Sequence, residues 1–468
     1  MKDHNKFQHT ILMLLFCLLP LFVFFILVIN GVELNPMLFF LFIVICCLAM
    51  FYFMRQTHTQ TETEISEENQ DIKNENVKGI IPVPDHLGDV FQANYIERVD
   101  DTLIYTGNLL TDADSAYQKL KESSDKIGVT ALLQEDDAGN TLVLVSKKLF
   151  PGAVTHTGMH HSGQPISTNE VSGEAKPSKP TVNLILFILT FITTTYAGAL
   201  QQGINLLKEP DKFNVGLPYG IALMVILGAH ELGHYFAAKH HKMNVTLPYF
   251  IPVPFALGTF GAFIRLKSPS ENRKALFDVG VAGPIAGLVF AIPALIIGLQ
   301  SSKIIPMSNE NVMMGGADVG SSILLALLAK ISVGKDLISG HTFQFSPLAF
   351  AGWLGLFVTA LNLLPIGQLD GGHIAHALFG RKNANTIGMV ALFSLFLLGL
   401  FVWSGLLTWA IIVFFLAGIK SAPPLNDVTK LDGKRVAIGL IAFIILFMIL
   451  VPVPHSFYQT LGINCPYV

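Results

Sequence analysis

Long apolar segments dominate the pattern of hydrophobic and polar positions along this 468-residue chain. A helix needs about 20 apolar residues to cross the hydrocarbon core of a bilayer. The pattern therefore predicts an α-helical polytopic membrane protein of about nine spans. The boundary near residue 404 rests on a short break at Trp403–Gly405. The expected spans are 11–29, 36–54, 184–204, 219–241, 274–299, 346–372, 386–403, 405–420 and 435–453.

A polar region interrupts the apolar segments between the second and third spans. Residues 55–88 have the composition of a linker, and residues 151–182 are rich in small and polar residues. Between them, residues 89–150 contain two strand-like runs (90–99 and 102–110), a helix over 112–128 and a hairpin over 130–148. These elements predict a small α+β cytoplasmic domain. The other expected divisions are an N-terminal transmembrane hairpin (1–54), a membrane core (183–421) and a C-terminal span with its tail (422–468).

Composition agrees with a membrane protein and excludes several other classes. Hydrophobic residues make up 51% of the chain and charged residues only 13%, about half the share in soluble domains. The formal net charge of −3 argues against a nucleic-acid partner. The four cysteines form no Cys-x-x-Cys pair, so neither a disulfide framework nor a thiolate zinc site is expected.

Titratable residues interrupt the apolar segment 219–241 in the order His230-Glu231-Leu232-Gly233-His234. On a helix, positions i and i+4 lie on one face, so both imidazoles can bind one Zn²⁺. The glutamate beside the first histidine suits a general base. Polar and ionisable groups within a membrane span are energetically unfavourable, which makes them functional candidates. We therefore expect metal chemistry at this helix.

A third zinc ligand is expected near the end of the span 346–372. Asp370 follows Pro365 and Gly367, which should break the helix there, and Gly371–Gly372 permits close backbone approach. Spacing alone leaves open that Asp370 merely borders the helix end. His373 and His376 are rival ligands. Asn362, two turns before Asp370, could hydrogen-bond a substrate backbone or an oxyanion.

Together, HELGH (230–234) and NLLPIGQLDGG (362–372) resemble the site-2 protease family of intramembrane zinc metalloproteases, whose pattern is HExxH followed by N-x-x-P-x-x-x-x-D-G. The resemblance covers about residues 184–421. It implies one Zn²⁺ per chain on His230, His234 and Asp370, with Glu231 as general base and Asn362 positioning the scissile peptide. No PDZ-like insertion is evident, and the N-terminal arrangement resembles a longer subgroup that includes the chloroplast EGY-type proteases.

The segment 245–268 after the HELGH helix is apolar and contains Pro248, Pro252 and Pro254, which exclude a continuous helix. We interpret it as a re-entrant loop or β-hairpin, although a shallow interfacial loop without substrate contact is also possible. An unpaired strand edge could hold a substrate in extended form. The candidate edge is 257–266, and its candidate substrate-binding residues are Gly258, Phe260, Gly261 and Phe263.

These observations predict an intramembrane zinc metalloprotease that cleaves transmembrane proteins or peptides within the lipid bilayer. A zinc transporter and a non-catalytic membrane scaffold are the alternatives. Basic residues gather in the segments 239–274, 381–382 and 420–435, which span counting places on one side. The positive-inside rule makes that side the cytoplasm and puts the active site towards it. The expected location is a bacterial inner membrane.

Overall fold

The computed structural model describes residues 87–99, 102–126, 129–135, 141–146, 180–253, 257–306, 316–317, 322–334, 341–401, 404–418 and 423–454. The expected spans 11–29 and 36–54 lie outside these residues, as do most of the two expected linkers. Within the described residues, five helical stretches are long and apolar enough to cross a membrane: Pro180–Gln201, Pro210–His240, Arg273–Gln300, Asp370–Leu400 and Gly433–Leu450. The expected total of nine spans is therefore not confirmed.

Most of these stretches are single helices: α5 (Pro180–Gln201), α7 (Arg273–Gln300) and α13 (Gly433–Leu450). The short η1 (Pro210–Lys212) leads into α6 (Phe213–His240), and Asp370–Leu400 belongs to α11 (Asp370–Phe401). Three further apolar helices are shorter: α9 (Ile323–Val333), α10 (Pro347–Leu363) and α12 (Ser404–Ala417). The short apolar segment 321–332 thus includes most of helix α9.

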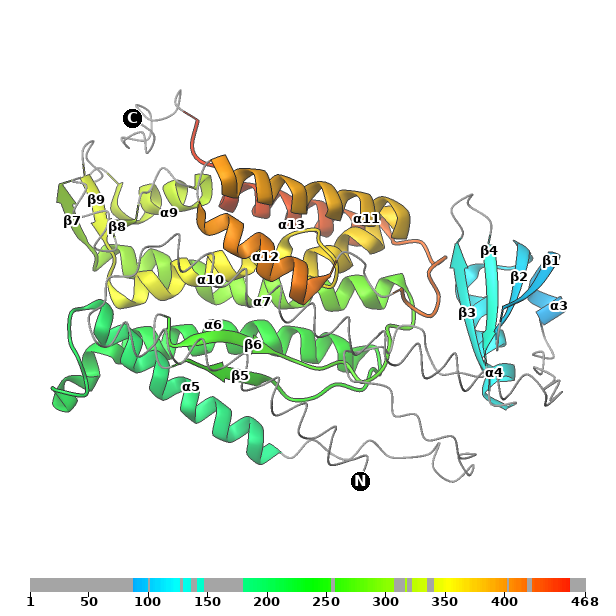
Figure 1. Ribbon diagram of the computed structural model, residues 1–468, viewed down its shortest axis with the longest axis horizontal. Coiled ribbons are helices and arrows are strands. Elements are labelled where there is room, and N and C mark those ends of the chain that lie inside the picture. The colour runs from blue at the N-terminus through cyan, green and yellow to red at the C-terminus, as the bar shows by residue number, and fades with distance from the viewer. Residues whose placement is uncertain are drawn as a thin grey trace, which may run out of the picture. The chain divides into compact units, whose positions relative to one another are not determined.

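Helices α6, α7 and α10 lie side by side and form the centre of the helical region (Figure 1). Glycine allows their close approach. A Cβ added at Gly352 of α10 would lie 2.5 Å from the backbone nitrogen of Leu295 in α7. At the other side of α6, a Cβ at Gly216 would lie 2.0 Å from the carbonyl oxygen of Thr195 in α5. Small residues at helix contacts are the usual way for helices to pack in lipid, where hydrophobic burial offers little driving force.

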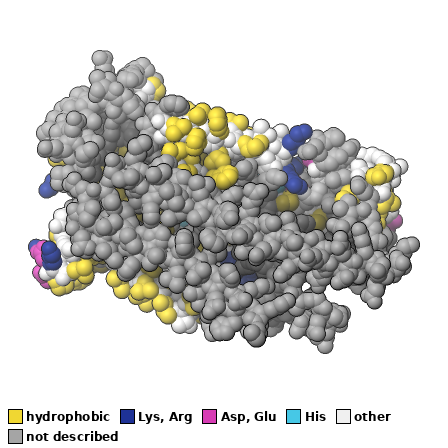
Figure 2. Space-filling view, in the orientation of Figure 1, with side chains coloured by type: hydrophobic (Ala, Val, Ile, Leu, Met, Phe, Trp, Pro, Cys, Tyr) yellow, Lys and Arg dark blue, Asp and Glu magenta, His cyan; other side chains and the backbone are white. Residues whose placement is uncertain are grey.

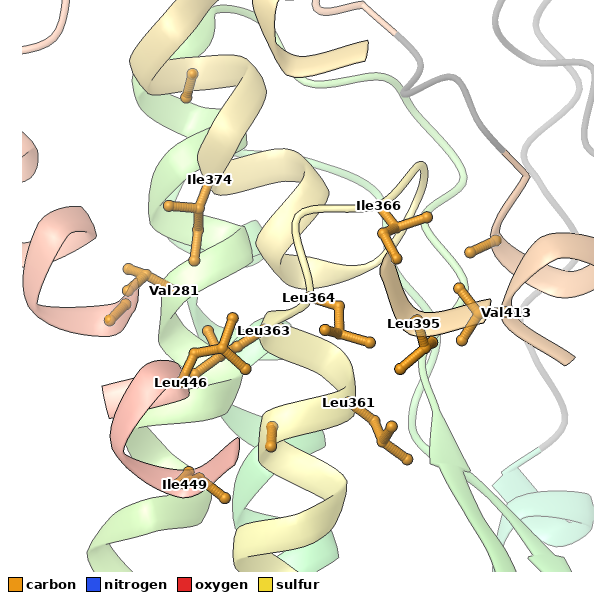
Figure 3. Close-up of a cluster of buried hydrophobic side chains, with 14 of the residues drawn as sticks. Val281, Leu361, Leu363, Leu364, Ile366, Ile374, Leu395, Val413, Leu446 and Ile449 are labelled. Carbon is orange, nitrogen blue, oxygen red and sulfur yellow. The ribbon is translucent and has the colours of Figure 1, made fainter. Parts of the chain in front are cut away.

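The expected span 346–372 is broken at its end, and the helix boundary differs from the prediction. Helix α10 ends at Leu363, and Asp370 begins α11 rather than ending the preceding span. Pro365 lacks an N–H, and Gly367 has a φ of 51°, so neither continues an α-helix. Buried Leu364 and Ile366 hold the turn in a hydrophobic cluster with residues of α7, α11, α12 and α13 (Figure 3).

Helix α11 reverses direction at Gly380, whose φ of 78° and ψ of 164° are not helical. Added Cβ atoms at Gly372 and at Gly388 would both lie within 3.5 Å of Ile366 backbone atoms. A straight helix would separate two residues 16 positions apart by about 24 Å. The two halves of α11 therefore run back along each other, and the boundary between the expected spans 346–372 and 386–403 lies at Gly380.

The strands and helix expected within 89–150 are present. Four antiparallel strands form a sheet in the order β1 (Phe91–Val99), β2 (Thr102–Leu109), β4 (Thr141–Ser146), β3 (Thr130–Glu135). Leu120 of α4 (Ala113–Lys126) packs with strand residues such as Leu133 and Val143 in a hydrophobic core of their own, to which α3 (Leu87–Val90) also contributes. We refer to residues 87–146 as the α+β unit.

Two small antiparallel sheets connect the helices. The segment after α6 forms a β-hairpin of β5 (Tyr249–Pro252) and β6 (Thr259–Phe263), as the sequence allowed. Between α7 and α10, β7 (Lys303–Pro306), β9 (His341–Gln344) and β8 (Gly316–Ala317) form a three-stranded sheet.

Hydrophobic side chains are widely exposed on the helical region. Figure 2 shows them gathered over much of the described part of one face. Examples include Val289 in α7, 59% exposed, and Phe447 in α13, 58% exposed. Contiguous apolar surface of this kind is typical of helices that face lipid.

Candidate metal centre

His230, Glu231 and His234 lie in the second half of α6 with buried side chains, and the two imidazoles contact α7. His230, Glu231 and His234 are exposed to 4%, 7% and 7%. The two imidazole centroids lie 4.8 Å apart with an interplanar angle of 71°. One face of α6 therefore presents two adjacent imidazoles in the apolar interior, as the i, i+4 spacing predicts.

Asp370 completes the group from the start of α11. Its Oδ2 lies 3.2 Å from Nε2 of His230 and 3.2 Å from Nε2 of His234. A tetrahedral zinc ion with ligands at about 2.0–2.2 Å holds neighbouring ligand atoms roughly 3.3–3.6 Å apart. Two histidine nitrogens and a carboxylate oxygen are also a donor set that zinc accepts. The three residues thus fit a zinc ion in both chemistry and spacing.

Two glycines of α7 make room for the imidazoles. An added Cβ would lie 2.1 Å from Nε2 of His234 at Gly283, and 3.2 Å from Nδ1 of His230 at Gly287. The histidines and the glycines are both four residues apart and pair in reverse order, as expected for antiparallel helices. The four-residue spacing of these glycines can be read from the sequence, but their contact with the histidines cannot.

A backbone carbonyl fixes the orientation of His234. Its Nδ1 lies 2.7 Å from the carbonyl oxygen of Val279 in α7. A carbonyl only accepts hydrogen bonds, so Nδ1 donates the proton of this bond, and Nε2, 3.2 Å from the Asp370 carboxylate, is the nitrogen left for a metal ion. This arrangement suits metal binding, since a ligating histidine commonly donates its second N–H to a carbonyl. The sequence held no signal for this partner, because any residue can supply a carbonyl.

The remaining predicted residues of the site lie beside the three ligand candidates. Asn362, in the last turn of α10, places Nδ2 3.2 Å from Nε2 of His230. The backbone of Ile264, directly after β6, hydrogen-bonds the Glu231 carboxylate. The hairpin, which follows α6 after a short connection, therefore folds back to contact the base candidate on that helix.

The rival ligands His373 and His376 fall outside the metal group. Among the described residues, His230, His234 and Asp370 form the one cluster that could hold a metal ion. His376 is fully buried and pairs instead with Asp427, with Nε2 2.9 Å from Oδ1. His376 therefore belongs to a different polar pair, in the part of α11 before Gly380. No pattern in the sequence indicates this pair, because Asp427 lies 51 residues after His376.

The four candidate substrate-binding residues of the hairpin differ in exposure. Gly258 is buried against α5: its carbonyl accepts a hydrogen bond from Thr193 at 2.7 Å, and a Cβ there would clash with the α5 backbone. Gly261 has a φ of 102° with open space around it. Phe260 and Phe263 are 72% and 48% exposed. The aromatic side chains and Gly261 are accessible, whereas Gly258 anchors the hairpin to α5.

The residues of this site lie in a segment that is similar to a known protein family. Residues 219–401 match the family model of Peptidase family M50. The matched segment contains the HELGH motif, Asn362 and Asp370. The resemblance to zinc metalloproteases of the site-2 protease type is therefore confirmed for this segment.

Curated relatives of this M50 segment extend the similarity towards the N-terminus. The chain is 33% identical over 304 residues to "Probable zinc metalloprotease EGY1, chloroplastic" of Arabidopsis thaliana, covering 60% of this chain and 55% of that protein. It is 27% identical over 376 residues to "Probable zinc metalloprotease EGY2, chloroplastic" of the same plant, covering 79% and 63%. The chain thus spans roughly half to two thirds of the length of these relatives. No solved structure gives a significant match.

Proposed function

We propose that the protein is a multi-pass intramembrane zinc metalloprotease, which hydrolyses peptide bonds in or near the membrane segments of other proteins. The observation that carries the proposal is the spacing of His230, His234 and Asp370, with one carboxylate oxygen 3.2 Å from both imidazoles. The M50 match over the same residues supports it. One zinc ion per chain follows from the one such cluster among the described residues.

In the proposed reaction, His230, His234 and Asp370 would hold zinc, which as a Lewis acid would polarise the scissile carbonyl and acidify water. Glu231, next to the first ligand, accepts the proton of the attacking water and passes it to the leaving amine. Asn362 donates a hydrogen bond from its amide to the scissile peptide. Its Nδ2, 3.2 Å from His230, supports that role.

The hairpin is proposed to hold the substrate. A transmembrane helix hides its peptide bonds in internal hydrogen bonds, so it must unwind before cleavage, and a strand edge can bind the extended chain. The Ile264 contact with Glu231 supports this assignment, because it brings the end of β6 beside the proposed base. Phe260, Gly261 and Phe263 are the proposed substrate contacts, and Gly258 contributes through its anchorage to α5.

The finer topology is also a proposal: about nine spans, with the metal site towards the cytoplasm. Basic segments expected on that side come together at one end of the helices, where Arg273 lies beside Gly380 and near Asp427, and Arg435 pairs with Asp278. This gathering supports the assignment through the positive-inside rule. A bacterial inner membrane is the proposed location. The relatives above are named chloroplastic.

The proposal is tested with purified protein in lipid vesicles containing a model transmembrane substrate. Wild-type protein should cleave the substrate. Glu231→Gln should retain zinc and lose cleavage by at least about 100-fold, the range for removing a general base. Zinc flux into the vesicles without cleavage would instead indicate a transporter, and neither activity would indicate a scaffold. Full cleavage by Glu231→Gln would refute the mechanism.

A further inference from the structure

The segment between α12 and α13 joins the α+β unit to the membrane helices through backbone hydrogen bonds. We call residues 424–429 the docking segment. The N–H of Leu133 in β3 donates to the carbonyl of Leu425, and the N–H of Asp427 donates to the carbonyl of Leu133. On its other side, the N–H groups of Leu425 and Asn426 donate to the carbonyls of Ser270 and Glu271. The docking segment thus extends the sheet at its β3 edge and ties that edge to the start of α7.

Side chains of the docking segment are buried in this junction. Asn426 is fully buried, and its Nδ2 donates to the carbonyl of Ala113 at 2.9 Å. Thr429 is 2% exposed and donates to Asp114 at 2.7 Å. Leu425 and Val428 pack against the hydrophobic core of the α+β unit. The docking segment therefore belongs to the fold of the α+β unit as much as to the helical region.

Ion pairs surround the junction and connect α4 directly to the residues around the start of α7. Lys121 lies 2.7 Å from Glu271, and Asp114 lies 2.8 Å from Lys274. Burial acts to raise the pKa of Glu271, but the hydrogen bond and charge of Lys121 outweigh it and lower that pKa. Both pairs are partly exposed, so each alone contributes little to stability. Helix α4 supplies the base in one pair and the acid in the other, so the two pairs together favour one position of α4 at the junction.

Asp427 connects the docking segment to α7 and α11, the helices that carry Val279 and Asp370. Its carboxylate is 2% exposed and lies 2.8 Å from Nε of Arg273 in α7 and 2.9 Å from Nε2 of His376 in α11. A buried carboxylate is stable only when its partners stay in place. His376 lies six residues after Asp370 on the same helical segment, about 9 Å along its axis. Arg273 lies six residues before Val279, whose carbonyl orients His234.

We propose that docking of the α+β unit positions the metal site, with Asp427 as the positioning residue that holds α7 and α11 in register. Docked, the segment keeps Asp427 between Arg273 and His376, and thereby fixes both the helix that begins at Asp370 and the helix that orients His234. Undocked, Asp427 withdraws, and the two helices lose a shared buried partner. The α+β unit thus controls zinc affinity from outside the membrane, an inference that rests on the proposed function of the same site.

The test reverses the charges that α4 presents at the junction. Asp114→Lys with Lys121→Glu sets like charges against Lys274 and Glu271. Hydrogen exchange at the amides of Leu133 and Asp427, which bond across the contact between β3 and the docking segment, reports docking without any need for zinc. Protection of strand β2 reports that the unit still folds. Zinc affinity is measured by competition with a chelator. The rescue variant adds Glu271→Lys and Lys274→Glu, and Lys119→Glu on the exposed face of α4 is the matched control.

The double variant should exchange faster at the Leu133 and Asp427 amides and keep β2 protected. It should bind zinc about threefold to tenfold more weakly, a smaller loss than on removing a direct partner of a metal ligand. Rescue should restore most of both values, because it re-forms the two ion pairs but not the hydrogen bond from Thr429 to Asp114. Lys119→Glu should match wild type. Asp427→Asn should weaken zinc binding with the domain still docked. Faster exchange with unchanged zinc affinity would overturn the positioning role, and unchanged exchange would overturn the docking contacts.

These outcomes are separate from those of the proposed function. If zinc affinity depends on docking but the wild-type protein cleaves no substrate, the protease function is rejected and the positioning role of Asp427 stands. If the double variant shows loosened docking but binds zinc and cleaves substrate like wild type, the positioning role is rejected and the protease function stands.

Discussion

At the scale of single residues, the site depends on glycine as much as on the charged side chains. The four-residue spacing of His230 and His234 identified the ligand pair from the sequence alone, because the helix period fixes which positions share a face. Gly283 and Gly287 leave the space that the imidazoles occupy. Their role follows only from the antiparallel contact of α6 with α7, a tertiary relation that no local pattern encodes.

A methyl group at Gly283 should therefore disturb the site. Gly283→Ala would place Cβ 2.1 Å from Nε2 of His234 and force that ring to move. We expect zinc affinity to fall by at least about tenfold, as for loss of a partner that orients a ligand. Gly228→Ala on α6, where the nearest side-chain atom lies 3.8 Å away, is the control and should bind zinc normally. Wild-type affinity in Gly283→Ala would contradict the tight fit.

Asp427 makes a pH-dependent contribution to stability. Burial alone would raise its pKa, but the hydrogen bond and charge of His376, with the charge of Arg273, lower the pKa below its usual value. A lowered folded-state pKa stabilises the fold fully above the unfolded pKa of about 3.9, and this contribution is lost as pH falls through the folded value. Glu135 of β3, 3.5 Å from Arg273, is the other charged group at this cluster.

Thermal unfolding as a function of pH tests this contribution. Below about pH 4, the melting temperature of the wild-type protein should fall more steeply than that of Asp427→Asn, which has no carboxylate to protonate. Parallel curves over the whole range would show that ionised Asp427 is not stabilised in the fold.

At the scale of elements, the sequence predicted most of the helices and strands but misplaced some boundaries. Hydrophobic periodicity located α5, α6, α7 and the strands of the α+β unit. It placed Asp370 at the end of one span, whereas the structure begins α11 there. It also left the end of that span at residue 372, whereas the chain reverses at Gly380. Both differences arise at glycine and proline positions, where the backbone angles depend on tertiary contacts rather than on local propensity.

The proposed substrate contact of the β5–β6 hairpin can be tested with a single substitution. Phe260 is 72% exposed on β6, so Phe260→Ala should leave folding and zinc content unchanged. If this side chain contacts substrate, the KM for a model substrate should rise several-fold with little change in kcat, because ground-state binding is what is lost. Phe213→Ala, at another exposed aromatic position in the first turn of α6, is the matched control. Equal KM values would remove Phe260 from the substrate contacts.

At the scale of the whole molecule, the buried polar junction could not be predicted from the sequence. The docking segment joins residues about 290 positions apart, such as Gln134 and Pro424, whose side chain and carbonyl lie 2.9 Å apart. Nothing local marks such a pairing. The sequence separated the small domain from the membrane core by composition, and the contacts between them emerge only from the three-dimensional structure.

Charge distribution predicts which ends of the helices share a side of the membrane. Lys267 and Lys430 follow the basic pattern and should be cytoplasmic, whereas Lys208 and Lys303 lie at the opposite helix ends. All four residues are exposed. Single cysteines at these positions, in a background in which the four native cysteines are serine, should react with an impermeant reagent from opposite sides of sealed vesicles. Labelling of Lys267 and Lys303 positions from the same side would contradict the topology.

The proposed function depends on one metal site with one catalytic base. The decisive measurement is bound zinc and substrate cleavage in the same preparations of wild type, Glu231→Gln and Asp370→Ala. We expect zinc with cleavage in the wild type, zinc without cleavage in Glu231→Gln, and the loss of both in Asp370→Ala. Retention of zinc and cleavage by Asp370→Ala would contradict the proposed function.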